Sequence, residues 1–313
     1  MLFRLLKQSQ KEGIDSKIIC LGMESFIADS IRSLGIEVFN IGLHRKGLNK
    51  FKKLVQMVIV VRRYRPDIVQ GWMYHGNLAA TITKIFLSPR SKLLWNVRQT
   101  LQTIENEKPL TRQVIRLNSL CSWSATNIIY NSFESRFQHE AIGFRGKSGV
   151  VVPNGIDLEE YFRSKTISKE VRAEVGIADG AVVLGHIGRY HPKKDHKSLI
   201  RALSTVCAKH MELVFILVGK DVDENNVELC ELLEESELNC RAILLGERND
   251  IPRLLNVVDI LLVSSAWGEG FPNVLAEAMA TEICCVTTDL GESSNIVSIY
   301  GKTVPPENSQ ELA

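Results

Sequence analysis

Short apolar runs rich in β-branched residues alternate with longer helix-like segments along most of the chain. Eleven of these runs predict strands, at residues 17–22, 38–41, 67–73, 93–97, 127–132, 150–153, 182–188, 213–219, 242–246, 259–265 and 284–289. Because the runs are apolar throughout, both faces of each strand should be covered, which is typical of parallel sheets flanked by helices. The pattern predicts an α/β fold.

Eleven strands are many for one open sheet, and 313 residues suffice for two domains with separate cores. A polar stretch from about residue 154 to 179 lies between the sixth and seventh runs. We therefore expect two doubly wound, Rossmann-like domains facing a cleft, at residues 1–164 and 165–313. Ligands of such sheets bind beyond the carboxyl ends of the strands. Polar side chains follow several of these ends, namely His75, Arg98, Arg189, Lys194, Arg248 and Glu269.

Composition narrows the class of protein. No apolar run approaches the roughly 20 residues that span a bilayer, and the start "MLFRLLKQSQ" is too short and too quickly polar for a signal peptide. The seven cysteines have no metal-ligand spacing and no paired framework, so we expect reduced cysteines in a cytoplasmic protein.

Charge is unevenly distributed. Residues 1–155 hold 23 Lys/Arg against 10 Asp/Glu, whereas the remainder holds 15 against 26. The basic excess peaks where no acid interrupts Arg45, Lys46, Lys50, Lys52, Lys53, Arg62, Arg63 and Arg65. Two interpretations stay open: a solvated face, or contact with an anionic membrane, which we favour. Nucleic acid is not expected, because aromatic platforms and recognition motifs are missing from the sequence.

The stretch "SSAWGEGFPNVLAEAMA", residues 264–280, places Glu269 and Glu277 with seven residues between them. Pro272 suits the first turn of a helix, and the free amides of that turn would form an anion site, here lined by Gly270, Phe271, Pro272 and Asn273. The two carboxylates would accept hydrogen bonds from hydroxyl groups on either side of the anion. A hydroxyl-rich group, a diphosphate and a second hydroxyl-rich group together describe a nucleotide-sugar. The alternative is a capped helix with surface glutamates.

A second stretch, "GHIGRYHPKKDHKSLIRAL" at residues 185–203, supplies cations. Gly188 ends an apolar strand, Arg189 follows it, and Lys194 lies at the entry to the next helix. Two cations near a strand end suit a diphosphate leaving group, whose charge grows as it departs. A solvated basic loop is the alternative, and it fits Arg189 less well.

These stretches, with "LLGERNDIPRLLNVVDILLVSS" and "TTDLGESSNIV", resemble the second domain of family-4 (group 1) glycosyltransferases. Those enzymes have the GT-B fold, use nucleotide-sugar donors and retain configuration at the transferred sugar. "VVVPNGID" and "RPDIVQGWMYHGNLAA" resemble segments of the first domain, so the resemblance covers nearly the whole chain.

The resemblance implies roles for individual residues. Arg189 and Lys194 would bind the diphosphate of a UDP- or GDP-linked donor, Glu269 would contact the transferred sugar, and Glu277 would hold the ribose. The loop 246–251, with Gly246 and Arg248, would flank the base. Neither a metal nor another cofactor is implied, because cations and a helix dipole take the metal's place. The implied acceptor is a glycan, here expected to be lipid-linked, at the inner face of the membrane.

The sequence also departs from the family. Arg98 stands where many relatives carry a histidine, and His75 is the nearby candidate to replace it, although a structural role for His75 is equally open. Glu282 and Cys284 occupy places where relatives have Gly and Pro. If position 282 needs a positive φ, glutamate there costs up to about 1 kcal/mol.

Both ends differ as well. Relatives begin with a strand and a glycine-rich turn, whereas this chain begins inside the following helix and stops before the helices that close the second domain. We therefore expect the strands at 17–22 and 67–73 to have unpaired edges. A truncated, inactive remnant that still binds nucleotide is one alternative function, and a GT-B-shaped sugar-nucleotide epimerase is another.

Overall fold

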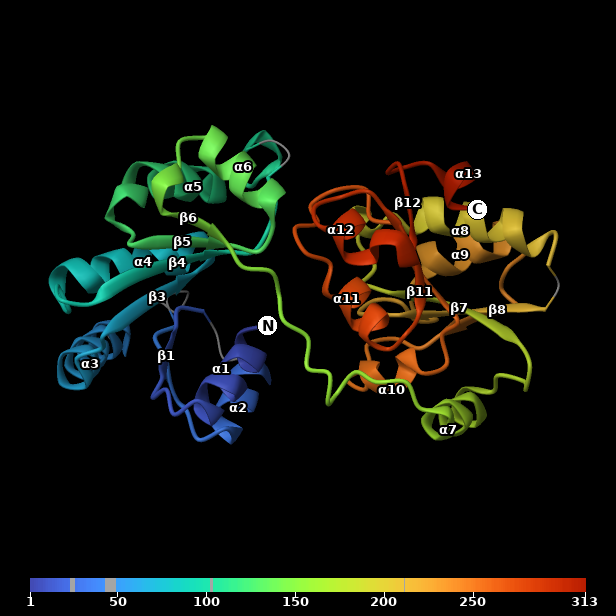
Figure 1. Cartoon of the computed structure of the whole chain (residues 1–313), viewed down its shortest axis with the longest axis horizontal. Coiled ribbons are helices and arrows are strands. Elements are labelled where there is room, and N and C mark those ends of the chain that lie inside the picture. Colours follow the sequence, from blue (N-terminus) through green and yellow to red (C-terminus); the bar gives the residue numbers. More distant parts are fainter. Residues whose placement is uncertain (23–25, 43–48, 102–103, 211) are drawn as a thin grey trace. The chain divides into compact units, whose positions relative to one another are not determined.

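The computed structural model describes residues 1–22, 26–42, 49–101, 104–210 and 212–313. The chain forms two compact units. The first comprises Met1–Val97, Ile104–Tyr130 and His139–Val152, and the second comprises Arg98–Thr103, Asn131–Gln138 and Pro153–Ala313. Each unit contains helices and parallel strands (Figure 1). The predicted α/β class is confirmed, whereas the boundary between residues 164 and 165 stays a prediction.

The strands of the first unit form two parallel sheets. β1 (Lys17–Cys20) pairs with β2 (Glu37–Asn40), and a separate sheet has the order β3 (Ile68–Trp72), β4 (Lys92–Val97), β5 (Asn127–Tyr130) and β6 (Gly149–Val151). Among the described residues β1 pairs only with β2, and β3 pairs only with β4. Within this described part of the chain, the edges of β1 and β3 that were expected to be unpaired have no strand partner.

In the described part of the sequence, α-helices alternate with these strands. They are α1 (Leu2–Lys11), α2 (Phe26–Ser33), α3 (Asn49–Tyr64), α4 (Met73–Phe86), α5 (Pro109–Cys121) and α6 (Phe133–Ala141). The last of them, α6, lies largely within the second unit. The four-stranded sheet has a well-buried centre, where Trp95 packs edge-on against Phe144 with 6.2 Å between ring centroids. The Trp95 Nε1–H donates to Thr81 Oγ1 at 3.1 Å, so its one polar atom stays satisfied inside the core.

The second unit is built on one parallel sheet with the order β12-β11-β10-β7-β8-β9. Its strands are β7 (Val182–Ile187), β8 (Leu213–Val218), β9 (Ala242–Leu244), β10 (Ile260–Val263), β11 (Cys284–Thr288) and β12 (Lys302–Val304). Its helices are α7 (Lys165–Val175), α8 (His196–Cys207), α9 (Val227–Glu235), α10 (Ile251–Leu255), α11 (Asn273–Ala280), α12 (Ser293–Val297) and α13 (Ser309–Leu312). All eleven predicted strands are present, and β12 was not predicted.

Alternation along β8 explains why its sequence is apolar throughout. Phe215 and Leu217 belong to the core on one face of the sheet, and Ile216 and Val218 belong to the core on the other. Successive side chains of a strand point to opposite faces, so a strand covered on both sides needs apolar residues at every position. Each fully buried side chain of this size contributes about 1.5–3 kcal/mol.

Candidate functional site

The strand order of the six-stranded sheet in the second unit indicates where on its carboxyl edge a ligand would bind. β7 and β10 are neighbours, and the chain continues outward from β7 to β8 and β9 but from β10 to β11 and β12 in the opposite direction. Ligands of open α/β sheets bind where the strand order reverses in this way. The loops that follow β7 and β10 carry the cations and the Glu269 carboxylate identified in the sequence.

The loop after β7 is fixed by a close backbone approach. The Gly188 amide donates to the Val218 carbonyl at 2.8 Å. A Cβ atom at Gly219, which has φ +154°, would lie 2.2 Å from the Gly188 carbonyl oxygen, so any larger residue there would displace this loop. Arg189 is exposed, and Lys194 ends a short 3-10 helix, Pro192–Lys194. Asp195 then begins α8 by accepting a hydrogen bond from the Ser198 amide at 3.1 Å.

Lys194 and Glu269 form an ion pair across the two loops. The Lys194 Nζ lies 2.5 Å from Glu269 Oε1, and the two side chains are 22% and 15% exposed. Ser265 Oγ donates to the same carboxylate oxygen at 2.8 Å, and Ser264 Oγ donates to the Lys194 carbonyl at 2.7 Å. The two residues that the sequence assigned to phosphate and sugar are therefore brought together, 75 positions apart in the chain.

A third loop, between β11 and α12, supports the Glu269 segment. Gly291 has φ +57°, and a Cβ atom there would lie 2.3 Å from the Glu269 carbonyl oxygen and 2.5 Å from that of Gly270. The next amide, that of Glu292, donates to the Gly270 carbonyl at 3.0 Å. Sequence analysis missed Gly291 and Ser265 as site residues. Ser265 follows the end of β10, and Gly291 follows the end of β11. Their positions in the sequence do not indicate that both contact the segment around Glu269.

Helix α11 follows the loop after β10, which carries Glu269, and starts one residue later than expected, with Pro272 as its N-cap. Among the described residues no side chain caps this end, and the Leu275 amide donates to the Pro272 carbonyl at 3.1 Å. Amides at the start of a helix are a favourable place for an anion. Glu277 lies one turn into α11 and is buried, with 8% of its surface exposed. The alternative of surface glutamates is therefore wrong for Glu277. A buried carboxylate is costly unless it is hydrogen-bonded, which favours a functional or structural role.

Asn273, the first residue of α11, is linked through Asn154 to Arg98. Asn273 Oδ1 accepts a hydrogen bond from Asn154 Nδ2 at 2.7 Å. Asn154 in turn accepts from Arg98 Nη1 at 2.6 Å, and burial lowers the pKa of the Arg98 guanidinium. Arg98 groups with the second unit. His75 lies exposed in the first turn of α4, in the first unit, and its part in catalysis stays a prediction.

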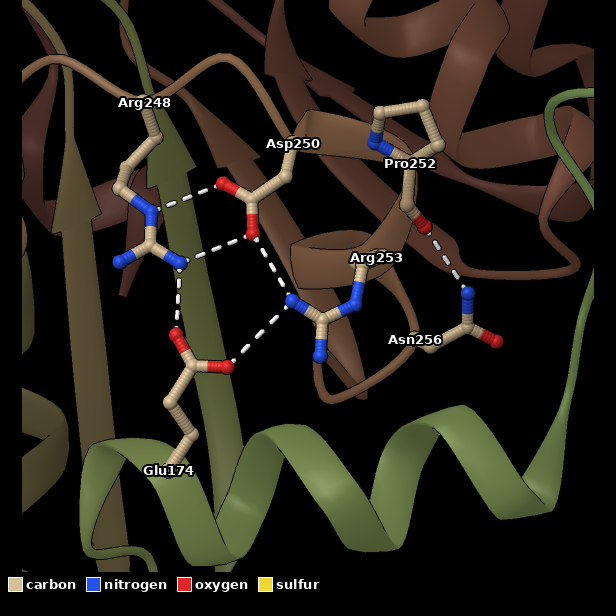
Figure 2. A network of polar contacts seen from close by, with 6 residues as sticks. All are labelled: Glu174, Arg248, Asp250, Pro252, Arg253 and Asn256. Carbon is tan, nitrogen blue, oxygen red and sulfur yellow. Dashed lines mark hydrogen bonds and ion pairs between the residues drawn. The ribbon is translucent and has the colours of Figure 1, made fainter.

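Arg248 is held by two carboxylates (Figure 2). Its Nε and Nη2 atoms donate to Asp250 at 2.8 Å each, and Nη2 also donates to Glu174 Oε1 at 2.8 Å. These bonds raise the pKa of Arg248 and lower the pKa of Glu174 and Asp250. The expected contact between Arg248 and a base stays a prediction.

Residues 181–313 match the family Glycosyl transferases group 1. Among curated proteins, the putative glycosyltransferase EpsF of Bacillus subtilis is 29% identical over 139 residues, 44% of this chain and 35% of that protein. The Escherichia coli UDP-Gal:alpha-D-GlcNAc-diphosphoundecaprenol alpha-1,3-galactosyltransferase is 29% identical over 151 residues, 47% of this chain and 38% of that protein. The chain thus spans little more than a third of the length of either relative.

The fold has close counterparts among solved structures. Anabaena Alr3699/HepE in complex with UDP superposes with a TM-score of 0.83 at 23% identity, over 98% of this chain and 83% of that one. The predicted GT-B fold is confirmed, and the second unit resembles the group 1 glycosyltransferases over residues 181–313.

The basic stretch for which a membrane contact was predicted lies partly on α3 (Asn49–Tyr64). Within the described residues, no helix combines the length and the apolar composition needed to cross a membrane. Lys52, Lys53, Arg62 and Arg63 lie on α3, and Arg65 directly follows it. Arg45 and Lys46, and the side chain of Lys50, lie outside what the structure describes.

Proposed function

We propose that this protein is a retaining glycosyltransferase of family 4 that moves a sugar from a UDP- or GDP-linked donor to a lipid-linked glycan during surface polysaccharide biosynthesis. The observation that carries the proposal is the Lys194–Glu269 pair at the strand-order reversal of a unit that matches the group 1 family. HepE was crystallised with UDP and with UDP-glucose, and the Escherichia coli relative acts on a diphosphoundecaprenol-linked sugar. These similarities support the donor and acceptor classes.

The ion pair suggests how the donor enters. The Lys194 Nζ donates to Glu269 Oε1 at 2.5 Å. A donor diphosphate would take over the ammonium group, together with Arg189 and the first amides of α11. Glu269 would then be released to accept hydrogen bonds from the hydroxyl groups of the sugar, while Glu277 holds the ribose. On binding, the Lys194 ammonium group would exchange the Glu269 carboxylate for the diphosphate, and the carboxylate would exchange the ammonium group for sugar hydroxyl groups. Neither charged group would be left without a partner.

The transfer step uses the same groups. The bond between the anomeric carbon and the diphosphate oxygen breaks, and the acceptor oxygen attacks the same face of the sugar, which retains configuration. The acceptor proton passes to the leaving phosphate oxygen. Arg189 and Lys194 stabilise the negative charge that grows there, which is a preorganised electrostatic effect. We further propose that the reaction is metal-independent and takes place at the inner face of the membrane.

The experiment is a donor panel with product analysis. The protein is incubated with UDP- and GDP-linked hexoses and an undecaprenyl-diphosphate-linked sugar, with and without EDTA, and the anomeric configuration of the product is determined by NMR. Transfer with retention in EDTA would support the proposal. Binding of donor nucleotide without turnover would favour the inactive remnant, and inversion would refute the mechanism.

A further inference from the structure

The loop that carries Glu269, residues 264–272, joins β10 to α11, and buried residues from other parts of the chain bond to its backbone. The Thr100 hydroxyl donates to the Glu269 carbonyl at 3.1 Å. The Glu292 amide donates to the Gly270 carbonyl at 3.0 Å. Thr100 and Glu292 are 8% and 6% exposed. The two peptide groups that directly follow the Glu269 side chain are therefore both bonded to buried residues.

Thr100 is held in place through its neighbours in the sequence. The Ser135 Oγ donates to the Gln99 carbonyl at 2.7 Å, and the Leu101 amide donates to Gln138 Oε1 at 2.6 Å. Ser135 and Gln138 lie on α6, within the part of that helix that belongs to the second unit. The Thr100 hydroxyl thus lies on a segment that is bonded to α6 on both sides.

Glu292 is bonded to the same helix. Its Oε1 atom accepts a hydrogen bond from the amide of Phe133, the first residue of α6, at 2.7 Å. Its Oε2 atom accepts from Asn295 Nδ2, also at 2.7 Å. A buried carboxylate is costly unless it is hydrogen-bonded, and the start of a helix also stabilises a negative charge. Both oxygen atoms of Glu292 are thus satisfied, and its side chain joins α6 to the loop between β11 and α12.

Close packing restricts the Glu269 loop at two positions. A Cβ atom at Gly270 would lie 3.0 Å from Asn131 Oδ1, and Asn131 is 2% exposed. The Gly291 backbone lies so close to the Glu269 carbonyl oxygen that a Cβ atom there would be 2.3 Å from it. These contacts, together with the two hydrogen bonds, restrict the directions that the Glu269 side chain can take.

The backbone contacts gain importance in the proposed exchange of partners. The Glu269 carboxylate accepts hydrogen bonds from Lys194 and from Ser265, and a donor diphosphate would take over the Lys194 ammonium group. Of these two bonds, only that from Ser265, at 2.8 Å, then remains. The backbone of residues 269 and 270 must therefore fix the carboxylate, because a misplacement of about 1 Å can cost about 100-fold in rate.

We propose that Thr100 and Glu292 are positioning residues, which hold the Glu269 carboxylate toward the transferred sugar while Lys194 binds the diphosphate. The inference rests on the proposed function and deepens it. Neither residue touches the reacting atoms, since each acts through a carbonyl group, that of Glu269 or that of Gly270. Loss of either contact should therefore weaken binding of the sugar end of the donor and spare the diphosphate end.

The first test replaces the Thr100 hydroxyl by a methyl group. Thr100→Val keeps the shape of the side chain but removes the donor, and Thr100→Ser keeps the donor. Dissociation constants for UDP, UDP-glucose, GDP and GDP-mannose are measured by calorimetry on the full chain. We expect Thr100→Val to bind the preferred nucleotide-sugar about tenfold more weakly, the effect of one lost hydrogen bond to a charged group, and the matching nucleotide within about twofold of wild type. Thr100→Ser should behave like wild type.

The second test changes the Glu292 side chain. Glu292→Ala removes the bond to the Phe133 amide, whereas Glu292→Gln keeps an oxygen atom that accepts it. The alanine variant should show the same selective loss of nucleotide-sugar affinity as Thr100→Val, and the glutamine variant should retain most of that affinity. Thr83→Val, at a position 7% exposed in α4, and Glu170→Gln, at an exposed position in α7, are the matched controls and should change neither affinity.

Hydrogen exchange tests the contacts without any donor. The amides of Gly270 and Phe271 should exchange faster in Thr100→Val and Glu292→Ala than in wild type, Thr100→Ser or the controls, because only the first two variants loosen the loop. Equal weakening of nucleotide and nucleotide-sugar would mean a general structural role and would overturn the inference. Unchanged nucleotide-sugar affinity in both Thr100→Val and Glu292→Ala would do the same.

The outcome for the wild type separates this inference from the proposed function. Wild-type protein that binds none of the four ligands would refute the proposed donor site. The exchange rates would then decide separately whether Thr100 and Glu292 fix the loop.

Discussion

Lowering the pH from 7 to 5 should destabilise the second unit through two histidines buried beside Lys194. His186 on β7 and His196 at the start of α8 are 2% and 3% exposed, with ring centroids 4.9 Å apart. His186 Nδ1 donates to the Leu262 carbonyl at 3.0 Å. Burial, and then the charge of His196, hold the pKa of His186 well below its usual range. Burial, followed by the charge of Lys194, lowers the pKa of His196 to about 4.

The sign follows from the two states. An unfolded histidine has a pKa of about 6.5, so the unfolded chain takes up protons before the folded one does. The contribution of the neutral, buried histidines to the free energy of unfolding is fully present above pH 6.5. It is lost as the pH falls from there toward 4. For His196 alone the shift corresponds to about 3 kcal/mol in total, of which about 2 kcal/mol is lost by pH 5. His186 adds to this loss.

The assay is scanning calorimetry of wild-type protein and His196→Phe at pH 7, 6 and 5. A loss of about 2 kcal/mol corresponds to a fall in Tm of about 4–8 °C for a unit of this size. The variant should fall by several degrees less, because it lacks one of the titrating groups. Glu174 and Asp250, whose pKa values are lowered by Arg248, lose their contribution only at lower pH. Parallel decreases in the two proteins would refute the reasoning.

Four other outcomes are expected. Glu277→Ala should weaken nucleotide binding by about 1.5–3 kcal/mol, and unchanged affinity by calorimetry would argue against a ribose contact. Arg189→Ala and Lys194→Ala should lower kcat more than they raise KM, because leaving-group charge grows toward the transition state; a pure KM effect would leave them as binding cations. Glu282→Gly should raise stability by up to about 1 kcal/mol in urea unfolding, since Glu282 has φ +61°. Sedimentation with anionic liposomes should be lost when three charges are reversed, those of Lys50, Lys52 and Lys53.

Features of the fold that depend on neighbouring residues in the chain, such as the strands, could be predicted from the sequence. Apolar runs located eleven strands, and the condition raised for position 282 by the glycine of relatives, a positive φ, is met at +61°. β12 was missed because it has three residues, of which Lys302 and Thr303 are exposed, so it lacks an apolar run. The pairing of Lys194 with Glu269 and that of Glu174 with Arg248 join residues more than 70 positions apart. Such contacts depend on strand order, which no local pattern specifies.

The separation of β1 and β2 from the four-stranded sheet has a consequence for how the first unit opens. Only four residue pairs join the two strands, and the small core beside them is centred on Leu6, Ile31 and Ile36. A two-stranded ribbon is marginal by itself, and weakly packed segments open at free energies below that of global unfolding. The amides of β1 and β2 should therefore exchange with solvent as one cooperative group, well before those of β4 and β5. A Tm for the first unit would then describe its four-stranded sheet alone.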